Sequence, residues 1–348
     1  MKIVIFSVQI PFIKGGAEYL VDMLYEQLKK RNHEVEIVTI PFKWYNSKTL
    51  INCMLMGRLT DLSEINGKKI DLVIAVKFPA YYINHPNKVV WLMHQHRQAY
   101  DLWKTKFGDL DKFEGGEFTK NLIYKSDSLY LKEAKSVFTI SKKVSERLLK
   151  YNNIDSKCLY HLPKNYEKFY FEKYDNYIFY PSRIDSIKRQ RLLVESACYI
   201  KTNMKIFIAG SGAESEVHFL KEIIRKNKLE NKVYLLGFIS EFEKIKYYAN
   251  CKAVYFGAMG EDYGYITLEA MLSQKTVIVH PDAGGPLEFI ENNYNGFIID
   301  DNPIEVAKII DKLYNEKDLA EDFGRNALNS INKKNFDWDY VINELIGE

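Results

Sequence analysis

The chain has 348 residues with a net charge of +3, and its 47% hydrophobic and 27% charged residues are typical of two globular domains rather than a disordered chain. No apolar run reaches the roughly 18–20 residues that span a bilayer, and MKIVIFSVQI enters a strand pattern without a signal-peptide region, so we expect a cytoplasmic protein. Four scattered cysteines without C-x-x-C spacing predict buried thiols and exclude a disulfide framework or zinc site: Cys53, Cys158, Cys198 and Cys251.

Strand and helix patterns alternate through the first half. KIVIFSV predicts a buried parallel strand, and AEYLVDMLYEQLKKR has apolar residues at Leu20, Val21, Leu24 and Leu28, the spacing of one helix face. Five further strands are predicted at EVEIVTI, DLVIAV, KVVWLM, SVFTI and KCLYHL. This order predicts a doubly wound, Rossmann-like α/β domain over residues 1–165.

The same scheme restarts in the second half. YIFYPS predicts a strand, RQRLLVESACYI a helix, and MKIFIAG, KVYLLG, KAVYFG and TVIVH further strands with helices between them. Parallel strands joined by helices require right-handed crossovers, so residues 166–330 are predicted as a second Rossmann-like domain. We expect a terminal helix in 331–348 to cross back to the first domain, and a cleft between the domains.

Ligands of open α/β sheets bind where strands end and helices begin, because helix amides favour anions there. After the first strand, Gly15 and Gly16 open a helix and leave its amides open to a phosphate. In the second half, PSRIDSIKRQ places Arg183 and Lys188 on a loop that we expect to be exposed, and IAGSGAESE supplies Gly210. For Gly15 and Gly16 the alternative interpretation is an ordinary tight turn. For Gly210 and Gly212 it is a dinucleotide-binding fingerprint that lacks its third glycine.

The stretch GEDYGYITLEAM carries two carboxylates, Glu261 and Glu269, around Gly264 and a helix predicted at Ile266–Leu272. One interpretation is an amphipathic helix with solvated acids. The other is a ligand site, because PDAGGPLEF follows the next strand with the same kind of glycine-rich helix start. Together with the loops that carry Gly15, Arg183 and Gly210, these two make five loops, which we expect to meet at one edge of the cleft.

These motifs resemble those of the retaining glycosyltransferases of family 4, which have the two-domain GT-B fold. The resemblance covers almost the whole chain through GGAEYL, SRIDSIKRQ, AGSGAE, LLGFIS, EDYGYITLEAM and AGGPLE. It implies that Glu261 contacts the donor sugar, that Glu269 contacts the nucleotide ribose, and that Arg183 and Lys188 bind the diphosphate. Further implied contacts are Gly15 and Gly16 at the diphosphate, Gly210, the turn Gly237–Phe238 near the base, and the amides that follow Gly264 at Tyr265, Ile266 and Thr267. The chain departs from the family after this helix, where it has Gln274, Lys275 and Thr276.

Two further patterns suggest metal sites. His94 and His96 would face one way on a strand, but no carboxylate or cysteine is placed to complete a site, and the resemblance instead puts His94 beside the donor sugar. The D-W-D of Asp337–Asp339 imitates a metal-binding D-x-D but lies in an amphipathic helix with Phe336, Trp338 and Val341. We predict no metal and no cofactor apart from the nucleotide-sugar donor.

The sequence therefore predicts a retaining, metal-independent hexosyltransferase that uses a UDP- or GDP-sugar and a glycan or lipid-linked acceptor for cell-surface polysaccharide or glycoconjugate synthesis. One alternative is an NAD-dependent oxidoreductase, which would have G-x-G-x-x-G directly after the first strand, where this chain has PFIKGGAE. A second alternative is a non-catalytic sugar-nucleotide-binding protein, against which the intact pair of glutamates argues.

Charge divides unevenly between the halves. Residues 1–165 hold 26 Lys and Arg against 17 Asp and Glu, a charge of +9, whereas residues 166–348 hold 23 against 29, a charge of −6. The donor is anionic, yet the half that the resemblance assigns to the donor is the acidic one, so the excess positive charge lies on the acceptor side. The basic stretch Lys104–Lys150 is either a solvated surface or a face that attracts an anionic membrane or a phosphate-bearing substrate, and no nucleic-acid partner is expected.

Overall fold

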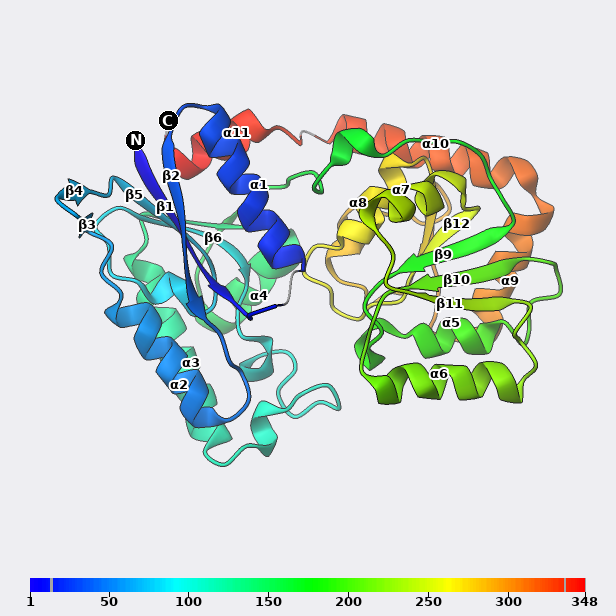
Figure 1. Cartoon of the computed structure of the whole chain (residues 1–348), viewed down its shortest axis with the longest axis horizontal. Helices are drawn as coiled ribbons and strands as arrows, with labels where there is room; N and C mark the ends of the chain where they lie inside the picture. The colour runs from blue at the N-terminus through cyan, green and yellow to red at the C-terminus, as the bar shows by residue number, and fades with distance from the viewer. Residues whose placement is uncertain (13–14, 335, 348) are drawn as a thin grey trace. The chain divides into compact units, whose positions relative to one another are not determined.

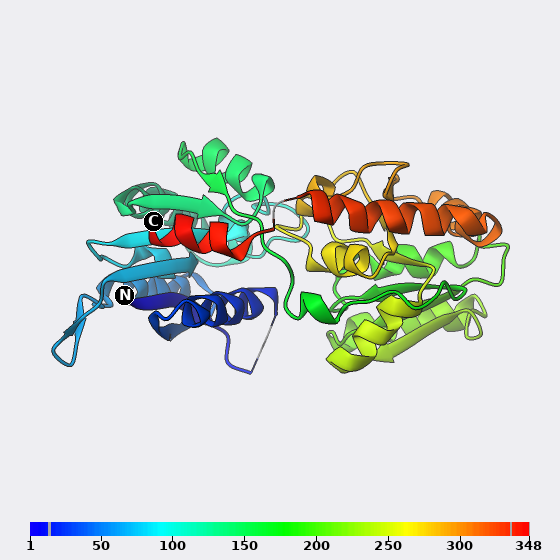
Figure 2. The same ribbon diagram turned by 90° about the horizontal axis from the view of Figure 1, so that it is seen from above.

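A computed structural model describes residues 1–12, 15–334 and 336–347. The chain divides into two compact units: unit 1 comprises Met1–Lys164 and Asp337–Glu348, and unit 2 comprises Asn165–Phe336. Each unit contains a six-stranded parallel sheet with helices on both faces, which confirms the predicted fold class (Figures 1 and 2). The predicted boundary at residue 330 falls inside helix α10 (Lys317–Lys333).

The sheet of unit 1 has the strand order β2-β1-β5-β6-β7-β8. Its strands are β1 (Lys2–Gln9), β2 (Glu34–Pro41), β5 (Leu72–Lys77), β6 (Lys88–His94), β7 (Ser136–Thr139) and β8 (Lys157–Cys158), and β3 (Glu64–Ile65) and β4 (Lys68–Lys69) form a separate hairpin. All residues of β5 are buried, as expected for a strand covered on both faces. The predicted strand KCLYHL is wrong beyond β8, because the chain leaves the sheet and packs His161 against Trp91 and Trp338.

Helices cover both faces of this sheet. Helices α1 (Gly16–Lys30) and α11 (Trp338–Ile346) lie on one face, and α2 (Ser47–Leu59) and α3 (Gly116–Tyr130) lie on the other (Figure 1); α4 is Lys142–Asn152. In the D-W-D stretch, Asp337 caps α11 by accepting from the amide of Asp339, and Asp339 pairs with Arg31. Both carboxylates thus have structural partners, and Phe336 lies outside the helix.

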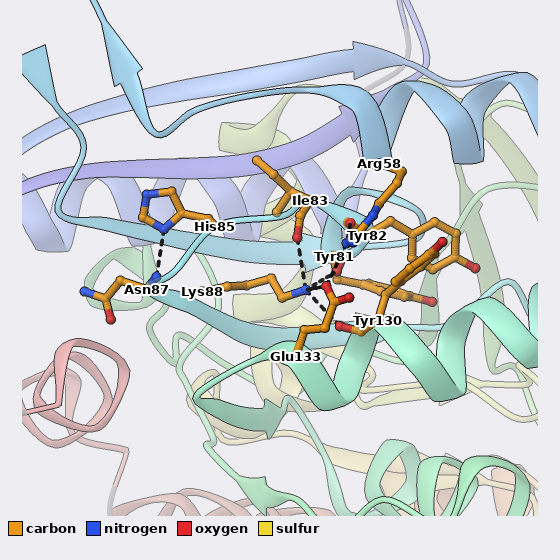
Figure 3. A network of polar contacts seen from close by, with 9 residues as sticks. All are labelled: Arg58, Tyr81, Tyr82, Ile83, His85, Asn87, Lys88, Tyr130 and Glu133. Atoms are coloured by element: carbon orange, nitrogen blue, oxygen red, sulfur yellow. Dashed lines mark hydrogen bonds and ion pairs between the residues drawn. The ribbon is translucent and has the colours of Figure 1, made fainter. Parts of the chain in front are cut away.

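A buried lysine, Lys88, ties several segments of unit 1 together (Figure 3). Its Nζ donates to the carbonyls of Tyr81 at 3.1 Å, Ile83 at 3.0 Å and Tyr130 at 2.8 Å, and lies 3.5 Å from the carboxylate of Glu133. Burial lowers the pKa of Lys88 to about 8 despite that carboxylate. The contacts join β6 to the turn after β5 and to the end of α3.

Arg58 extends this network to helix α2 (Figure 3). Its Nη1 donates to the Glu133 carboxylate at 2.7 Å and to the Tyr82 carbonyl at 3.1 Å, and its guanidinium lies 4.3 Å from the centroid of the Tyr130 ring. Buried charges need such partners because desolvation is costly. The network therefore fixes how α2 and α3 lie side by side.

The sheet of unit 2 has the strand order β11-β10-β9-β12-β13-β14. Its strands are β9 (Tyr177–Pro181), β10 (Lys205–Ala209), β11 (Val233–Gly237), β12 (Ala253–Phe256), β13 (Thr276–Val279) and β14 (Gly296–Ile298). Helices α5 (Gln190–Ser196) and α6 (Glu214–Lys226) lie on one face, and α7 (Glu241–Asn250), α8 (Tyr265–Leu272) and α10 lie on the other (Figure 1); α9 is Pro303–Asn315.

Two sequence predictions for unit 2 need correction. The helix predicted over RQRLLVESACYI is shorter at both ends: Arg189 has a left-handed φ of 54° and precedes the helix, and the helix ends at Ser196, after which residues 197–199 form a turn. The thiol of Cys251 is buried, as is that of Cys53 in unit 1, but Cys158 is half-buried and Cys198 is exposed, so the prediction of four buried thiols is wrong for the last two.

Candidate functional site

Backbone hydrogen bonds join the loops that follow β9, β10 and β11 in unit 2. The amide of Ile184 donates to the carbonyl of Ser211 at 2.9 Å, and the amide of Gly210 donates to the carbonyl of Gly237 at 2.7 Å. Gly210 has a φ of 139°, and a Cβ there would lie 2.2 Å from the carbonyl oxygen of Ser182. Only glycine fits this crossing point, so packing alone already accounts for it.

The loops after β12 and β13 are joined in the same way. The amide of Glu261 donates to the carbonyl of Ala283, and the amide of Gly285 donates to the carbonyl of Glu261, both at 2.8 Å. Gly264 precedes α8 with a left-handed φ of 90°, where an added Cβ would lie 2.5 Å from Pro286 Cγ. These contacts hold residues 260–264 against the loop PDAGGPLEF, which follows β13.

Two of the predicted site residues in unit 2, Lys188 and Glu261, form an ion pair. Lys188 ends a short 3-10 turn, Ser186–Lys188, and its side chain is only 18% exposed, so the expectation of an exposed Lys188 is wrong. Arg183 is 67% exposed, as expected, and its guanidinium lies 3.3 Å from the Asp185 carboxylate. One cation is therefore held beside the predicted sugar-contacting carboxylate, and a second is open to solvent.

Glu269 lies in α8, with the residue only 8% exposed. Its Oε1 accepts from Lys244 Nζ at 2.9 Å, and its Oε2 accepts from the Tyr248 hydroxyl at 2.8 Å. The interpretation of solvated acids on an amphipathic helix is therefore wrong for Glu269. Neither of its partners was found from the sequence, because both lie on α7.

The first turn of α8 differs in part from the expectation. The amide of Thr267 donates to the carbonyl of Gly264 at 3.0 Å, so it is already bonded, whereas Tyr265 and Ile266 occupy the first two helical positions. The hydroxyl oxygen of Thr267 is buried without a hydrogen-bond partner in the described part of the chain.

The predicted base-contacting turn lies at the end of β11. Gly237 has a left-handed φ of 69°, and Phe238, the next residue, is 84% exposed. An exposed ring that follows the end of a strand offers an apolar surface on which a planar base could stack. This contact stays a prediction.

In unit 1, the helix start after β1 is partly occupied by a side chain. The amide of Gly15 donates to the Glu18 carboxylate at 2.8 Å, so the expectation that both glycine amides are open is wrong for Gly15, while Gly16 begins α1. Residues 13 and 14 lie outside the described residues. The same carboxylate lies 3.9 Å from the Nζ of Lys77, the last residue of β5.

Lys77 was missed from the sequence, although a lysine that ends the apolar run DLVIAV gave a usable signal. It is 9% exposed and lies opposite His94 in the register of β5 and β6. Burial lowers the pKa of Lys77, and Glu18 only partly opposes this shift. A desolvated cation beside a histidine at the end of parallel strands is typical of a functional edge.

The two histidines of WLMHQHRQAYDLW have different surroundings. His94 is half-buried, and its Nδ1 lies 2.8 Å from the carbonyl oxygen of Gln95. His96 is buried and stacks on Phe78 with 5.2 Å between ring centroids. Burial, with the nearby His94, lowers the pKa of His96 to about 3, so His96 is a neutral core residue. His94 remains the candidate of the two.

A buried carboxylate, Asp127, holds the loop that follows β6. It accepts from the hydroxyls of Tyr82 and Tyr100 at 2.6 Å and of Tyr81 at 3.1 Å, and from the side-chain amide of Gln95 at 3.3 Å. Burial raises the pKa of Asp127 to about 6, although all four hydrogen bonds oppose this shift. The cluster fixes the first residues after His94.

The described residues contain no group of three or more His, Cys, Asp or Glu side chains that could hold a metal ion. None of the helices in the described ranges is long and apolar enough to cross a membrane.

Two parallel-sheet units with helix-start loops at their carboxyl edges are also found in glycosyltransferases of known structure with the GT-B fold. Residues 163–330, nearly all of unit 2, match the family described as glycosyl transferases group 1. The predicted resemblance to group 1 glycosyltransferases is thereby confirmed.

Relatives agree with this assignment. The chain is 22% identical to an uncharacterized glycosyltransferase of Methanocaldococcus jannaschii over 97% of this chain and 94% of the relative. It is 32% identical to the poly(ribitol-phosphate) alpha-N-acetylglucosaminyltransferase of Staphylococcus aureus, over 44% of this chain and only 31% of that protein. The structure of Anabaena HepE in complex with UDP and glucose superposes with a TM-score of 0.67 and 18% identity, over 100% of this chain and 98% of that one, which shows the shared fold.

Proposed function

We propose that this glycosyltransferase transfers a hexose from a UDP- or GDP-sugar, with retention at the anomeric carbon and without a metal, to a hydroxyl of a glycan or lipid-linked acceptor. The observation that carries the proposal is the loop edge of unit 2, where Lys188 and Glu261 are in contact and Glu269 is buried in α8. The UDP-bound relative HepE and the sugar-transferring relative of Staphylococcus aureus support this donor class.

The cations and amides of unit 2 are suited to a diphosphate leaving group. Breaking the bond to the nucleotide builds negative charge on the phosphate oxygens, and fixed positive groups there lower the barrier. Arg183, Lys188 and the first amides of α8 would supply them. Because Lys188 is paired with Glu261, a bound diphosphate would compete for the ammonium and leave the carboxylate for the sugar hydroxyls.

Retention fits a reaction on one face of the sugar. The departing phosphate oxygen would take the proton of the acceptor hydroxyl as the new bond forms, so that no separate base is needed. Glu261 would orient the donor hydroxyls and balance positive charge on the ring, and Glu269 would hold the ribose. On the resemblance alone, we extend the proposal to unit 1, where the Gly16 amide would bind the diphosphate and His94 would face the bond that breaks.

A nucleotide screen tests the proposal. UDP or GDP should raise the Tm, because a ligand that binds only the folded state stabilises it, whereas NAD should not. A panel of UDP- and GDP-sugars should then show slow hydrolysis with one donor. Stabilisation by NAD alone would favour the oxidoreductase alternative, and nucleotide binding without turnover of any donor would favour the non-catalytic one.

We further propose that the acceptor is presented at an anionic membrane, and that unit 1 contacts this membrane. The supporting observation is an exposed face of the neighbouring helices α2 and α3, called the α2–α3 face (Figure 1). It combines exposed apolar side chains with lysines: Lys48, Leu55, Met56, Leu59, Phe118, Lys125 and Leu129 on the two helices, and Lys132 in the short turn that follows α3. Apolar groups enter the headgroup region while lysines attract anionic lipids, at about 1 kcal/mol each.

A further inference from the structure

The carboxylate of Glu269 is held by two side chains from a different helix. Lys244 and Tyr248 lie four residues apart on α7 and therefore project from the same helix face. Lys244 Nζ donates to one carboxylate oxygen at 2.9 Å, and the Tyr248 hydroxyl donates to the other at 2.8 Å. Tyr248 is fully buried, and Glu269 is 8% exposed. Both oxygens are thus fixed away from bulk water.

The two partners orient this carboxylate and satisfy it in its buried position. Burying a carboxylate is costly without a counter-charge. Burial lowers the pKa of Lys244, but the carboxylates of Glu269 and Glu241 outweigh it and raise the pKa above its usual value. Burial, together with Glu269, raises the pKa of Tyr248 well above its usual value, so its hydroxyl stays a donor.

Each oxygen of Glu269 has accepting capacity left after these bonds, because a carboxylate offers about four lone-pair sites. The remaining sites suit neutral donors, such as sugar hydroxyls. A buried polar site that is built for a hydroxyl rejects an analogue lacking it, because its acceptor is then left unpaired.

We infer that Lys244 and Tyr248 are positioning residues for nucleotide recognition: they set the Glu269 carboxylate to accept from the ribose hydroxyls and so make the enzyme select ribonucleotide over deoxyribonucleotide donors. The inference rests on the proposed function, which puts the ribose at Glu269. Beyond the proposed function, the inference assigns a positioning role to Lys244 and Tyr248 and predicts a preference for ribonucleotides that depends on them.

Tyr248→Phe is the most direct test. Calorimetry would give Kd for UDP, 2′-deoxy-UDP and 3′-deoxy-UDP, and for the GDP series. We expect the wild type to prefer the ribonucleotide by about 10–100-fold over one deoxy form, the Tyr248→Phe variant to lose about 3–10-fold of that preference, and Glu269→Gln to lose nearly all of it. Lys244→Met should also lower the preference.

Tyr177→Phe is the matched control, because the Tyr177 hydroxyl donates to the carbonyl of Tyr247 on the same helix and does not bond to Glu269. It should keep the wild-type preference. A double-mutant cycle adds a readout that a merely structural role would not move: Tyr248→Phe should change the preference no further in a Glu269→Gln background.

The outcomes distinguish a failure of the positioning role from a failure of the proposed function. The positioning role is overturned if Tyr248→Phe weakens binding of the ribonucleotide and the deoxyribonucleotide by the same factor, or if the variant keeps the wild-type preference. Binding of UDP or GDP by the wild type without any ribose preference also overturns it and leaves the proposed function standing. Absence of binding by both nucleotides overturns the proposed function itself.

Discussion

Units 1 and 2 have the same kind of sheet but hold their functional edges differently. In unit 2, loops after five successive strands are joined by backbone bonds and glycine contacts, as between Gly210 and Gly237. In unit 1, a buried charged side chain does this work at the loop after β6, where Asp127 accepts from the hydroxyls of Tyr82 and Tyr100.

The family match falls in the unit whose loops are held by backbone contacts. Backbone crossings that only glycine permits require particular residues at particular places, and residues 163–330 match the family model. A network of buried side chains can be built from many residue combinations. Unit 1 carries the α2–α3 face and Lys77. The predictions below test this contrast.

Glu261→Gln should have the largest effect. We expect turnover of the nucleotide sugar to fall at least about 100-fold, because a group that balances charge in the transition state is lost. Binding of UDP or GDP should persist, since Lys188 is released from its ion pair. Kinetics and calorimetry check both, with the exposed Glu214→Gln as control. Equal losses of binding and turnover would contradict the division of roles between Glu261 and Glu269.

Asp127→Asn should change the pH dependence of stability through unit 1. The folded pKa of about 6 lies above the ordinary value of 3.8, so folding takes up a proton in between, and the free energy of unfolding should fall as pH rises from about 4 to 6. At about 1.4 kcal/mol per pH unit, this contribution is about 2–3 kcal/mol. Urea unfolding of both proteins across this range measures it. Parallel curves for wild type and variant would contradict it.

Arg183→Ala should weaken binding of the nucleoside diphosphate by about 10–100-fold, the effect of one charge-assisted contact. The fold should be intact, because this side chain is 67% exposed. Arg191→Ala is the matched control, since Arg191 is 62% exposed nearby and pairs with Glu195. Lys188→Ala should weaken binding too, but it also removes the partner of Glu261. Unchanged affinity in both Arg183→Ala and Lys188→Ala would remove the phosphate assignment.

Reversing charges on the α2–α3 face should have the smallest effect for each residue. Lys125→Glu with Lys132→Glu should weaken sedimentation with anionic vesicles at low salt, and high salt should abolish binding, because screening acts over about 8–10 Å. Lys68→Glu with Lys69→Glu, on the hairpin, is the control. A wild type that ignores anionic vesicles at low salt would make this face a solvated surface and favour a soluble acceptor.

The spacing of apolar residues along the chain was sufficient to predict most of the fold. Short apolar runs and helical spacing placed the central strands of both sheets, because a strand buried on both faces has a nearly continuous apolar sequence. The errors lie at ends, as at KCLYHL, where packing of His161 on two tryptophans takes the chain out of the sheet. Loop positions followed from the strands, which is why Arg183, Glu261 and Gly264 could be singled out.

The sequence by itself determined the two Rossmann-like units, the loops at their strand ends and the pair of glutamates in GEDYGYITLEAM, since these depend on patterns within a few residues. Only the tertiary structure decided the partners. Glu261 meets Lys188 across 73 residues of sequence, and Glu269 meets Lys244 and Tyr248 across 25 and 21. The first pair forms where the sheet brings two strand ends together, and the other two form where helices α7 and α8 pack on one face of that sheet. No local spacing encodes which side chains then face one another.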